Sequence, residues 1–393
     1  MYIHRLAESK LSELLKGKKV IMLLGARQVG KTTLVEPFAK HTKSLFLNCD
    51  VVTDRNRLMT ASAQSVETAM NTLGDPELLI IDEAQNLPEV GRIVKGWYDS
   101  NVATKIVLLG SSSLDLLDAT AEPLTGRNRK IFLTPLLFEE LLRNQDWYSK
   151  ELTNDLLKEY WAVQINGLVL GHMVYGGYPE VVTSTNKEEC LAELTSDYLL
   201  RDVLYNGLVK SPDLIKRLLA LLAYQAGSKV NVSELANALN VTRPTVQDYL
   251  QLLERSYVIF TVGSYSTNLR NEISKDRKIF FWDTGVRNAL LKEFSMSPLR
   301  SDIGSLFENW VMAEIAKKNL LQGDRFNIFF WRKTDGGEVD IVIKGTDTFK
   351  AYEVKWSKTS KTRGGRAFTN AYGIPVETIT QDNVIDVLLA ESL

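Results

Sequence analysis

The stretch that decides the fold is residues 20–33, Val20-Ile21-Met22-Leu23-Leu24-Gly25-Ala26-Arg27-Gln28-Val29-Gly30-Lys31-Thr32-Thr33. Its first five residues are apolar and predict a buried strand, and residues 25–32 fit G-x-x-x-x-G-K-[ST] at every fixed position. This pattern predicts a turn whose backbone N–H groups surround phosphate oxygens, followed by a helix whose N-terminus adds partial positive charge. The alternative is a chance glycine-rich turn before a helix, and the complete match in this context argues against it.

The motif also assigns roles to individual side chains. We expect Lys31 to reach the β- and γ-phosphates of ATP and the Thr32 hydroxyl to bind Mg²⁺. The predicted nucleotide-binding set is Gly25, Ala26, Arg27, Gln28, Val29, Gly30, Lys31, Thr32, Thr33 and Asp82.

A second apolar run, Leu78–Ile81, ends in the carboxylates Asp82 and Glu83. We expect Asp82 to hold Mg²⁺ through water and Glu83 to orient and polarise the water that attacks ATP. Taken alone, an apolar run before Asp-Glu is as often an ordinary strand end. Its place after Lys31, with the run Leu45–Leu47 between the two motifs, favours P-loop ATPases with a catalytic glutamate over kinase-type P-loop enzymes.

Two further residues are candidates for catalysis. Ser111 follows the apolar run Ile106–Leu109, where a polar side chain could sense the γ-phosphate; the alternative is a serine that caps the next helix. Arg127 precedes the run Ile131–Leu133, and we expect it to stabilise phosphoryl-transfer charge in the site of a neighbouring subunit. The alternative for Arg127 is a solvated basic turn.

The composition of the chain narrows its class. It has 393 residues, of which 45% are apolar and 24% charged, and a net charge of -1. This balance excludes a histone-like polycation, so any nucleic acid would have to be held by local basic patches. Two cysteines and three histidines exclude a disulfide scaffold and a zinc finger. With no stretch typical of a signal peptide or a membrane span, we expect a soluble, cytoplasmic protein.

The pattern along the chain predicts four segments. Residues 1–137 alternate short apolar runs with helical patterns, which is typical of a parallel sheet covered on both faces. Residues 138–210 are expected to form a helical linker or lid. Residues 211–275 are expected to be winged-helix-like, and residues 276–393 to form a second α/β domain.

The winged-helix expectation rests on the order of elements after residue 211. Helices are predicted over residues 214–222 and 233–239 and from residue 243, with Ser233 and Thr242 as N-caps, and the strand 257–262 would follow as a wing. The alternative is a winged helix used for protein packing. The outward positions of the third helix are expected to be Arg243, Thr245, Gln247, Asp248 and Gln251.

In the last segment, Glu308 lies on a predicted helix, Asp340 on a strand, and Glu353-Val354-Lys355 at the end of the next strand, where alternation puts Glu353 and Lys355 on one face. This order of residues resembles a PD-(D/E)xK restriction-nuclease core. The predicted metal ligands are Glu308, Asp340 and Glu353, and Lys355 is expected to orient or help deprotonate the attacking water. Binding of nucleic acid without cleavage and a purely structural domain are the alternatives.

One stretch beside these residues is strongly basic. Residues 344–366 contain seven Lys or Arg and two Asp or Glu, whereas the winged-helix-like segment has only a mild basic excess. We therefore expect DNA to contact the C-terminal half, with weak, salt-sensitive affinity unless several subunits act together.

Nearly the whole chain resembles a large family of prokaryotic ATP-binding proteins, in which an AAA-type ATPase domain precedes a C-terminal domain of unknown function. The resemblance is carried by these motifs: 27–33 (RQVGKTT), 82–85 (DEAQ), 110–112 (GSS), 124–127 (LTGR), 135–136 (PL), 138–140 (FEE), 176–180 (GGYPE), 198–202 (YLLRD), 283–285 (DTG), 307–309 (FEN), 338–340 (EVD) and 353–355 (EVK).

The resemblance implies an ATP site with Mg²⁺ and a homo-oligomer, with a ring as one form. The expected function is a Mg²⁺-dependent ATPase that acts on DNA, either as a motor or as an ATP-regulated nuclease. The alternative is a signalling switch in which bound ATP controls protein partners and no DNA is processed.

Overall fold

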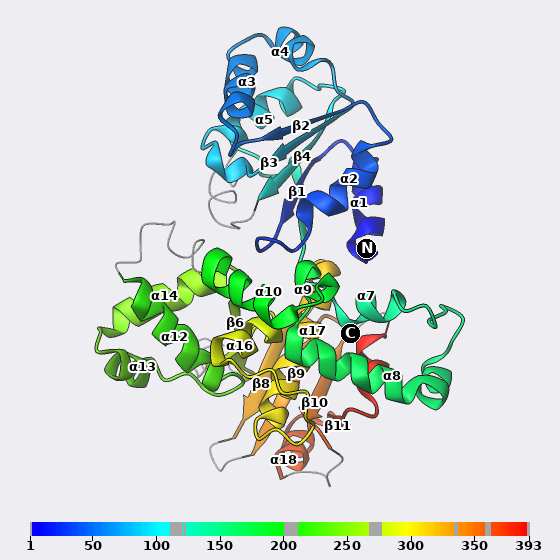
Figure 1. The fold of residues 1–393 in the computed structure, drawn as a ribbon, viewed down its shortest axis with the longest axis vertical. Coiled ribbons are helices and arrows are strands. Elements are labelled where there is room, and N and C mark those ends of the chain that lie inside the picture. The colour runs from blue at the N-terminus through cyan, green and yellow to red at the C-terminus, as the bar shows by residue number, and fades with distance from the viewer. Residues whose placement is uncertain are drawn as a thin grey trace. The chain divides into compact units, whose positions relative to one another are not determined.

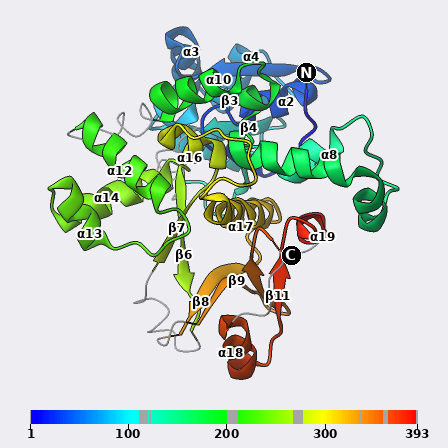
Figure 2. The same cartoon turned by 60° about the horizontal axis from the view of Figure 1, so that its bottom comes forward.

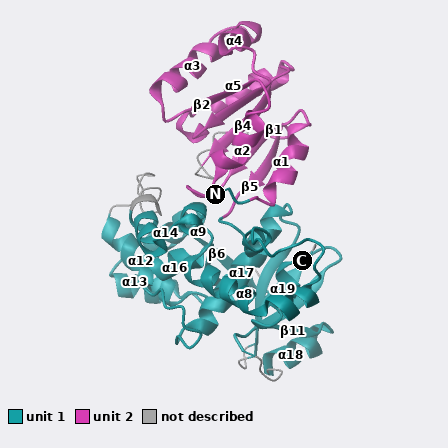
Figure 3. Cartoon of the chain, turned by 45° about the vertical axis from the view of Figure 1, so that its right-hand side comes forward, with its two compact units in different colours: residues 1–3, 135–393 teal, residues 4–134 magenta. Residues whose placement is uncertain are grey.

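The computed structural model describes residues 2–110, 120, 123–199, 211–266, 277–333, 337–357 and 363–390. These residues form two compact units, residues 4–134 and residues 1–3 with 135–393 (Figure 3). The three segments expected after residue 137 lie in one compact unit, and their boundaries stay predictions.

The N-terminal unit is built on a parallel five-stranded sheet (Figure 1). The strands, in the order β2-β3-β4-β1-β5, are β1 (Val20–Leu24), β2 (Ser44–Asn48), β3 (Leu78–Asp82), β4 (Lys105–Gly110) and β5 (Asn128–Phe132). The helices and the 3₁₀ turn are α1 (Ala7–Leu15), α2 (Lys31–Ala39), α3 (Val52–Ser62), α4 (Val66–Leu73), η1 (Ala84–Asn86) and α5 (Val90–Asp99). Every residue of β1 and β3 is buried, as expected for apolar strands covered on both faces.

Strand β5 differs from the apolar run that predicted it. It begins at Asn128 and pairs residues 128–132 with the whole of β1. Because β5 is an edge strand with Arg129 and Lys130 exposed, its first half carries no apolar pattern. In the sequence, only the second half of β5 belongs to the apolar run Ile131–Leu133.

The C-terminal unit contains a six-stranded mixed sheet. Its strands, in the order β11-β10-β9-β8-β6-β7, are β6 (Ile259–Ser264), β7 (Arg277–Phe281), β8 (Asn327–Arg332), β9 (Glu338–Lys344), β10 (Phe349–Val354) and β11 (Val376–Ile379). Helix α17 (Ile303–Leu321) packs on one face through the buried residues around Phe307 and Trp310. Helix α18 (Arg363–Tyr372) covers β9 and β11 through the separate cluster around Phe368 (Figure 2).

The rest of this unit is mostly helical, as expected. Its other helices are α7 (Phe138–Arg143), α8 (Asn154–Tyr175), α9 (Pro179–Thr183), α10 (Lys187–Glu193), the π-helix η2 (Leu194–Leu199), α12 (Pro212–Tyr224), α13 (Val232–Leu239), α14 (Arg243–Arg255), α16 (Thr284–Leu291) and α19 (Val384–Leu388).

The segment predicted to be winged-helix-like has its three helices, α12, α13 and α14, with two differences from expectation. Thr242 caps α14 as predicted, but Ser233 is not the cap of α13; Asn231 is, because its side chain accepts hydrogen bonds from the N–H groups of Ser233 and Glu234. The predicted wing strand begins only at Ile259. It pairs antiparallel with β7 and parallel with β8, so it is part of the six-stranded sheet.

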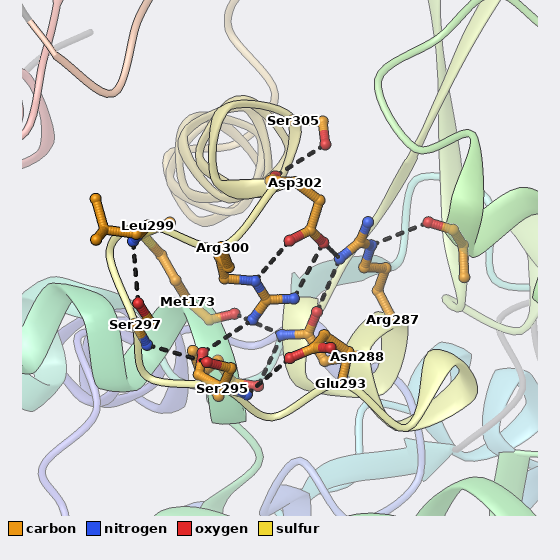
Figure 4. Close-up of polar contacts among 12 residues, drawn as sticks. Met173, Arg287, Asn288, Glu293, Ser295, Ser297, Leu299, Arg300, Asp302 and Ser305 are labelled. Atoms are coloured by element: carbon orange, nitrogen blue, oxygen red, sulfur yellow. Dashed lines mark hydrogen bonds and ion pairs between the residues drawn. The ribbon is translucent and has the colours of Figure 1, made fainter.

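Two buried arginines share one carboxylate between α16 and α17 (Figure 4). Asp302 accepts hydrogen bonds from Arg300 Nε at 2.6 Å and from Arg287 Nη1 at 2.5 Å. Arg287 also donates to the carbonyl of Ala223 in α12 at 2.9 Å. These contacts join the helical segment to the start of α17.

The outer edge of β7 is occupied by side-chain and backbone partners. The carbonyls of Arg277 and Ile279 accept from the N–H groups of Val230 and Gly227. The buried amide of Asn309 in α17 accepts from the N–H of Phe281 at 3.0 Å and donates to its carbonyl at 2.9 Å. Strand β7 is thereby fixed to α17.

Candidate functional site

The glycine-rich turn connects β1 to α2 at the carboxyl edge of the N-terminal sheet. A Cβ on Gly25 would lie 2.0 Å from the Leu133 carbonyl oxygen, so only glycine fits this position. Gly30, at φ 89°, is in the left-handed region and directly precedes the first turn of α2. The loop therefore delivers backbone N–H groups at a helix N-terminus, as the motif predicted.

Lys31 is buried inside this turn. Its Nζ donates to the carbonyl oxygens of Gly25 at 3.0 Å and Ala26 at 2.8 Å. An ammonium held at the centre of the loop is placed to interact with phosphate oxygens that enter it.

Thr32 and Asp82 come together although they are far apart in sequence. The Thr32 hydroxyl donates to Asp82 Oδ2 at 3.1 Å, and Asp82 Oδ1 accepts from the N–H of Glu83 at 2.8 Å. Glu83 has φ 47°, and its carboxylate accepts a hydrogen bond from the side chain of Gln85. Strand β4 lies between β1 and β3, so the two motifs are separated by one strand in the sheet.

Arg5 supports the loop and was missed by the sequence reasoning. Its buried guanidinium donates to the carbonyls of Val29 and Thr134, each at 2.7 Å. It thereby connects the nucleotide loop to the segment after β5. A single arginine before the first helix carries no local pattern, so no sequence signal marked it.

Of the two other catalytic candidates of this unit, the structure describes only Arg127. Ser111 lies outside the described residues. Arg127 precedes β5, whose first residue pairs with Val20, so it lies at the sheet edge opposite the glycine-rich turn. Its guanidinium contacts Asp99 at the end of α5 at 2.6 and 3.1 Å.

In the C-terminal unit, Glu308 faces the sheet, as predicted. Its Oε1 is 3.0 Å from Nζ of Lys278, a residue of β7 that the sequence analysis did not single out. Burial raises the pKa of Glu308 to about 7, and the charge of Asp340 adds to this effect. Lys278 also contacts Glu338 at 2.5 Å.

The structure places the other nuclease-like residues at the ends of β9 and β10. Asp340 Oδ2 accepts from the N–H of Val354 at 2.8 Å and contacts Lys355 Nζ at 3.3 Å. Glu353 is buried beside Gly365 at the start of α18, where a Cβ would lie 2.9 Å from its Oε1. Lys355 and Asp340 therefore meet.

Two of the three predicted metal ligands already have partners within the chain. Across the parts of the chain that the structure describes, no three His, Cys, Asp or Glu side chains are grouped to hold one metal ion. Ammonium and N–H donors engage Glu308 and Asp340, and the metal site of Glu308, Asp340 and Glu353 stays a prediction.

Surface positions expected to contact nucleic acid are accessible where they are described. On α14, Arg243, Gln247 and Gln251 are exposed, and Thr245 is half-buried. In the basic stretch, Lys350, Arg363 and Arg366 are exposed, and residues 358–362 lie outside the described ranges. No helix in the described parts of the chain is long and apolar enough to cross a membrane.

Three family models match parts of the chain. Residues 168–297 match one domain of unknown function (DUF8612), and residues 303–385 match another (DUF4143). Residues 17–142 match the AAA domain. The N-terminal unit is a P-loop ATPase domain of the AAA-like type.

Relatives of similar organisation occur in bacteria and archaea, and each carries the name uncharacterized protein. One from Mycobacterium tuberculosis is 24% identical over 359 residues, covering 90% of this chain and 74% of the relative. One from Methanocaldococcus jannaschii is 25% identical over 380 residues, covering 93% and 80%. One from Haemophilus influenzae is 24% identical over 408 residues, covering 98% and 89%.

Among solved structures, a Walker-type ATPase of Pyrococcus abyssi has a TM-score of 0.50 with 18% identity, over 74% of this chain and 96% of that chain. This likeness concerns the fold alone. The winged-helix and nuclease-like character of the C-terminal unit stay predictions.

Proposed function

We propose that the N-terminal unit binds and hydrolyses ATP with Mg²⁺, and that the C-terminal unit directs this activity to DNA. The observation that carries the ATPase proposal is the contact between the Thr32 hydroxyl and Asp82, which brings the two motifs to one point beside the buried Lys31. A complete phosphate-binding loop next to a paired carboxylate is the arrangement that nucleoside triphosphate hydrolysis requires.

The residues at this point suit Mg²⁺. The hydroxyl of Thr32 and the carboxylate of Asp82 are oxygen donors, which Mg²⁺ prefers, and they are 3.1 Å apart. Bound with ATP, the ion would neutralise charge on the phosphates. Thr32 would bind it, and Asp82 would hold it directly or through water.

Glu83 is the proposed group that orients the attacking water. It follows Asp82 directly, and the left-handed backbone at Glu83 turns the chain into η1. The hydrogen bond from Gln85 fixes the orientation of its carboxylate. A fixed carboxylate can align water and accept its proton as the bond to the γ-phosphate breaks.

The test is ATP hydrolysis and nucleotide binding measured on the full chain with Mg²⁺. Lys31→Ala is expected to lose ATP binding, because the phosphates lose their buried cation. Glu83→Gln is expected to keep binding while turnover falls by about 10²-fold or more, since the general base is removed. Lys16→Ala, an exposed lysine in the same unit, is the matched control. Normal turnover by Glu83→Gln would contradict the assignment.

The DNA proposal is supported by the exposed polar face of α14 and the exposed cations of the basic stretch. Phosphate contacts would dominate, so binding should weaken steeply with salt. Substituting Arg363 and Arg366 together by Gln should reduce the slope of log affinity against log salt by about two, because two phosphate contacts are lost. A matched pair, Lys16→Gln with Lys18→Gln, should leave the slope unchanged.

ATP turnover with and without single-stranded, duplex and branched DNA separates this proposal from the signalling alternative. Stimulation by any of these substrates supports action on DNA. Slow turnover that is indifferent to all of them, together with undetectable DNA binding, would favour the switch that acts on protein partners.

A further inference from the structure

One lysine occupies the centre of the acidic cluster in the C-terminal unit. Lys278 comes from β7, Glu308 from α17, and Glu338 and Asp340 from β9. The Lys278 ammonium is 3.0 Å from Glu308 Oε1 and 2.5 Å from Glu338 Oε1. One cation thus connects two carboxylates from different elements, and the charge of Asp340 acts on the same ammonium.

This lysine is built into the fold. Its side chain is only 7% exposed, and its Nζ lies 5.4 Å from the centre of the Phe330 ring. Gly227 covers the Glu308 side of the cluster closely, because a Cβ there would lie 3.5 Å from the carboxylate. A buried ammonium with such partners does not leave its position as a mobile surface lysine does.

The ammonium and a divalent ion compete for the same oxygens. Mg²⁺ binds carboxylate oxygens at about 2.0–2.1 Å and demands octahedral geometry, whereas the oxygens here surround a nitrogen at hydrogen-bond distance. Asp340 Oδ2 is further engaged by the N–H of Val354 and by Lys355. Binding of a metal by Glu308 and Glu338 would require Lys278 to give up both ion pairs and move out of a buried position.

We propose that Lys278 is an internal counter-ion that takes the place of a divalent metal in this cluster. In the intact protein Lys278 engages the carboxylates of Glu308 and Glu338 and Lys355 engages that of Asp340, and these carboxylates bind no metal ion. This inference concerns the C-terminal unit and does not depend on whether the N-terminal unit hydrolyses ATP.

The proposal is tested by Mn²⁺ binding, followed by electron paramagnetic resonance on the nucleotide-free full chain. All variants carry Asp82→Asn, so that the carboxylate of the nucleotide site does not contribute. The parent should show no Mn²⁺ site in the cluster. Lys278→Met should gain one site, with an affinity about tenfold or more above any residual Mn²⁺ binding by the parent. Lys278→Arg, which keeps the cation, should not gain it, and Lys278→Met with Asp340→Asn should lose it again.

Thermal unfolding gives a second measurement. Mn²⁺ should raise the melting temperature of Lys278→Met but not that of the parent, because the ion replaces the missing ammonium. A folded Lys278→Met that binds no Mn²⁺ would overturn the proposal.

A second comparison decides the matter if Lys278→Met does not fold. The parent is then compared with Glu308→Gln and Asp340→Asn, each in the same Asp82→Asn background. Equal Mn²⁺ binding by all three supports the internal counter-ion. A parent site that either substitution removes would refute it.

Discussion

Lys31 is held by the loop that it serves. Its ammonium satisfies the carbonyls of Gly25 and Ala26, so the loop has a bound cation before any phosphate enters. Arg5 fixes the carbonyl of Val29 in the same loop. The loop is therefore organised from both sides, which lowers the ordering that ATP must bring about on binding.

Arg127 leads to a prediction about assembly. It lies at the opposite edge of its own sheet from the glycine-rich turn, so it does not reach its own site, and service to a neighbouring subunit's site would require its contacts with Asp99 to open. Mixing Arg127→Ala protein with Glu83→Gln protein should then restore some ATP turnover at mixed interfaces. The measurement is turnover across mixing ratios, with Arg129→Ala, an exposed neighbour, as the control for Arg127→Ala. If no mixture exceeds the sum of its components, Arg127 does not act across subunits.

For single residues, the sequence predicts which side chains form the nucleotide site better than it predicts the distant residues that side chains contact. The fixed motif spacing singled out Lys31, Thr32 and Asp82 because nucleotide chemistry imposes a local pattern. Arg5 and Lys278 have no such pattern: each acts through contacts with residues distant in the chain.

Among the elements, the start of α17 depends on one carboxylate. Burial opposes ionisation of Asp302, but the hydrogen bonds from Arg300 and Arg287 hold the pKa of its carboxyl below the ordinary value. Asp302 thus stays ionised and neutralises one of two buried guanidinium charges (Figure 4).

Asp302→Asn should therefore destabilise the C-terminal unit strongly. Both arginines would lose their buried anion, and breaking a buried pair costs about 3–5 kcal/mol. Denaturant unfolding of the full chain is the measurement, and Asp382→Asn, an exposed position, is the control expected to change the free energy of unfolding by less than about 0.5 kcal/mol. A loss as small as the control's would show that the arginines find other partners.

Element prediction succeeded where burial produces a pattern. The fully buried strands β1 and β3 appear in the sequence as apolar runs, and the cap at Thr242 also appears there. The pairing of β6 with β8 does not, because strand partners distant in sequence leave no periodic signal.

Across the whole molecule, one contribution to the pH dependence of stability comes from His172, and it is opposite in sign to that of Glu308, whose pKa is raised. This side chain is buried, and its Nδ1 accepts a hydrogen bond from the Trp310 indole at 3.0 Å. Burial, assisted by the charge of Lys317, lowers the pKa of His172 to about 3. The folded state therefore keeps the imidazole neutral at pH values where the unfolded chain binds a proton.

The direction of the pH dependence follows from the lowered pKa of His172. At pH values above about 6.5, the ordinary pKa of histidine, His172 does not lower stability, and as the pH falls toward 3 its contribution to the free energy of unfolding should decrease by up to about 1.4 kcal/mol per pH unit. Urea unfolding between pH 7 and 5 measures this through tryptophan fluorescence, since every tryptophan except Trp97 lies within residues 135–393. His172→Asn should remove the destabilisation on acidification that His172 causes, so that this variant loses less stability than the parent between pH 7 and 5, while His4→Asn, at an exposed position, should follow the parent. An unchanged slope in His172→Asn would assign the pH dependence to other groups.

The closed outer edge of β7 has a consequence for association. A sheet edge with free N–H and C=O groups can add a strand from another molecule, which leads to strand-exchanged dimers or fibrils. Here the carbonyls of residues 277 and 279 are already bonded to the N–H groups of Val230 and Gly227, and both backbone groups of residue 281 to the amide of Asn309. These contacts oppose strand addition at this side of the sheet, so a partner peptide that extends the sheet is expected beside β11.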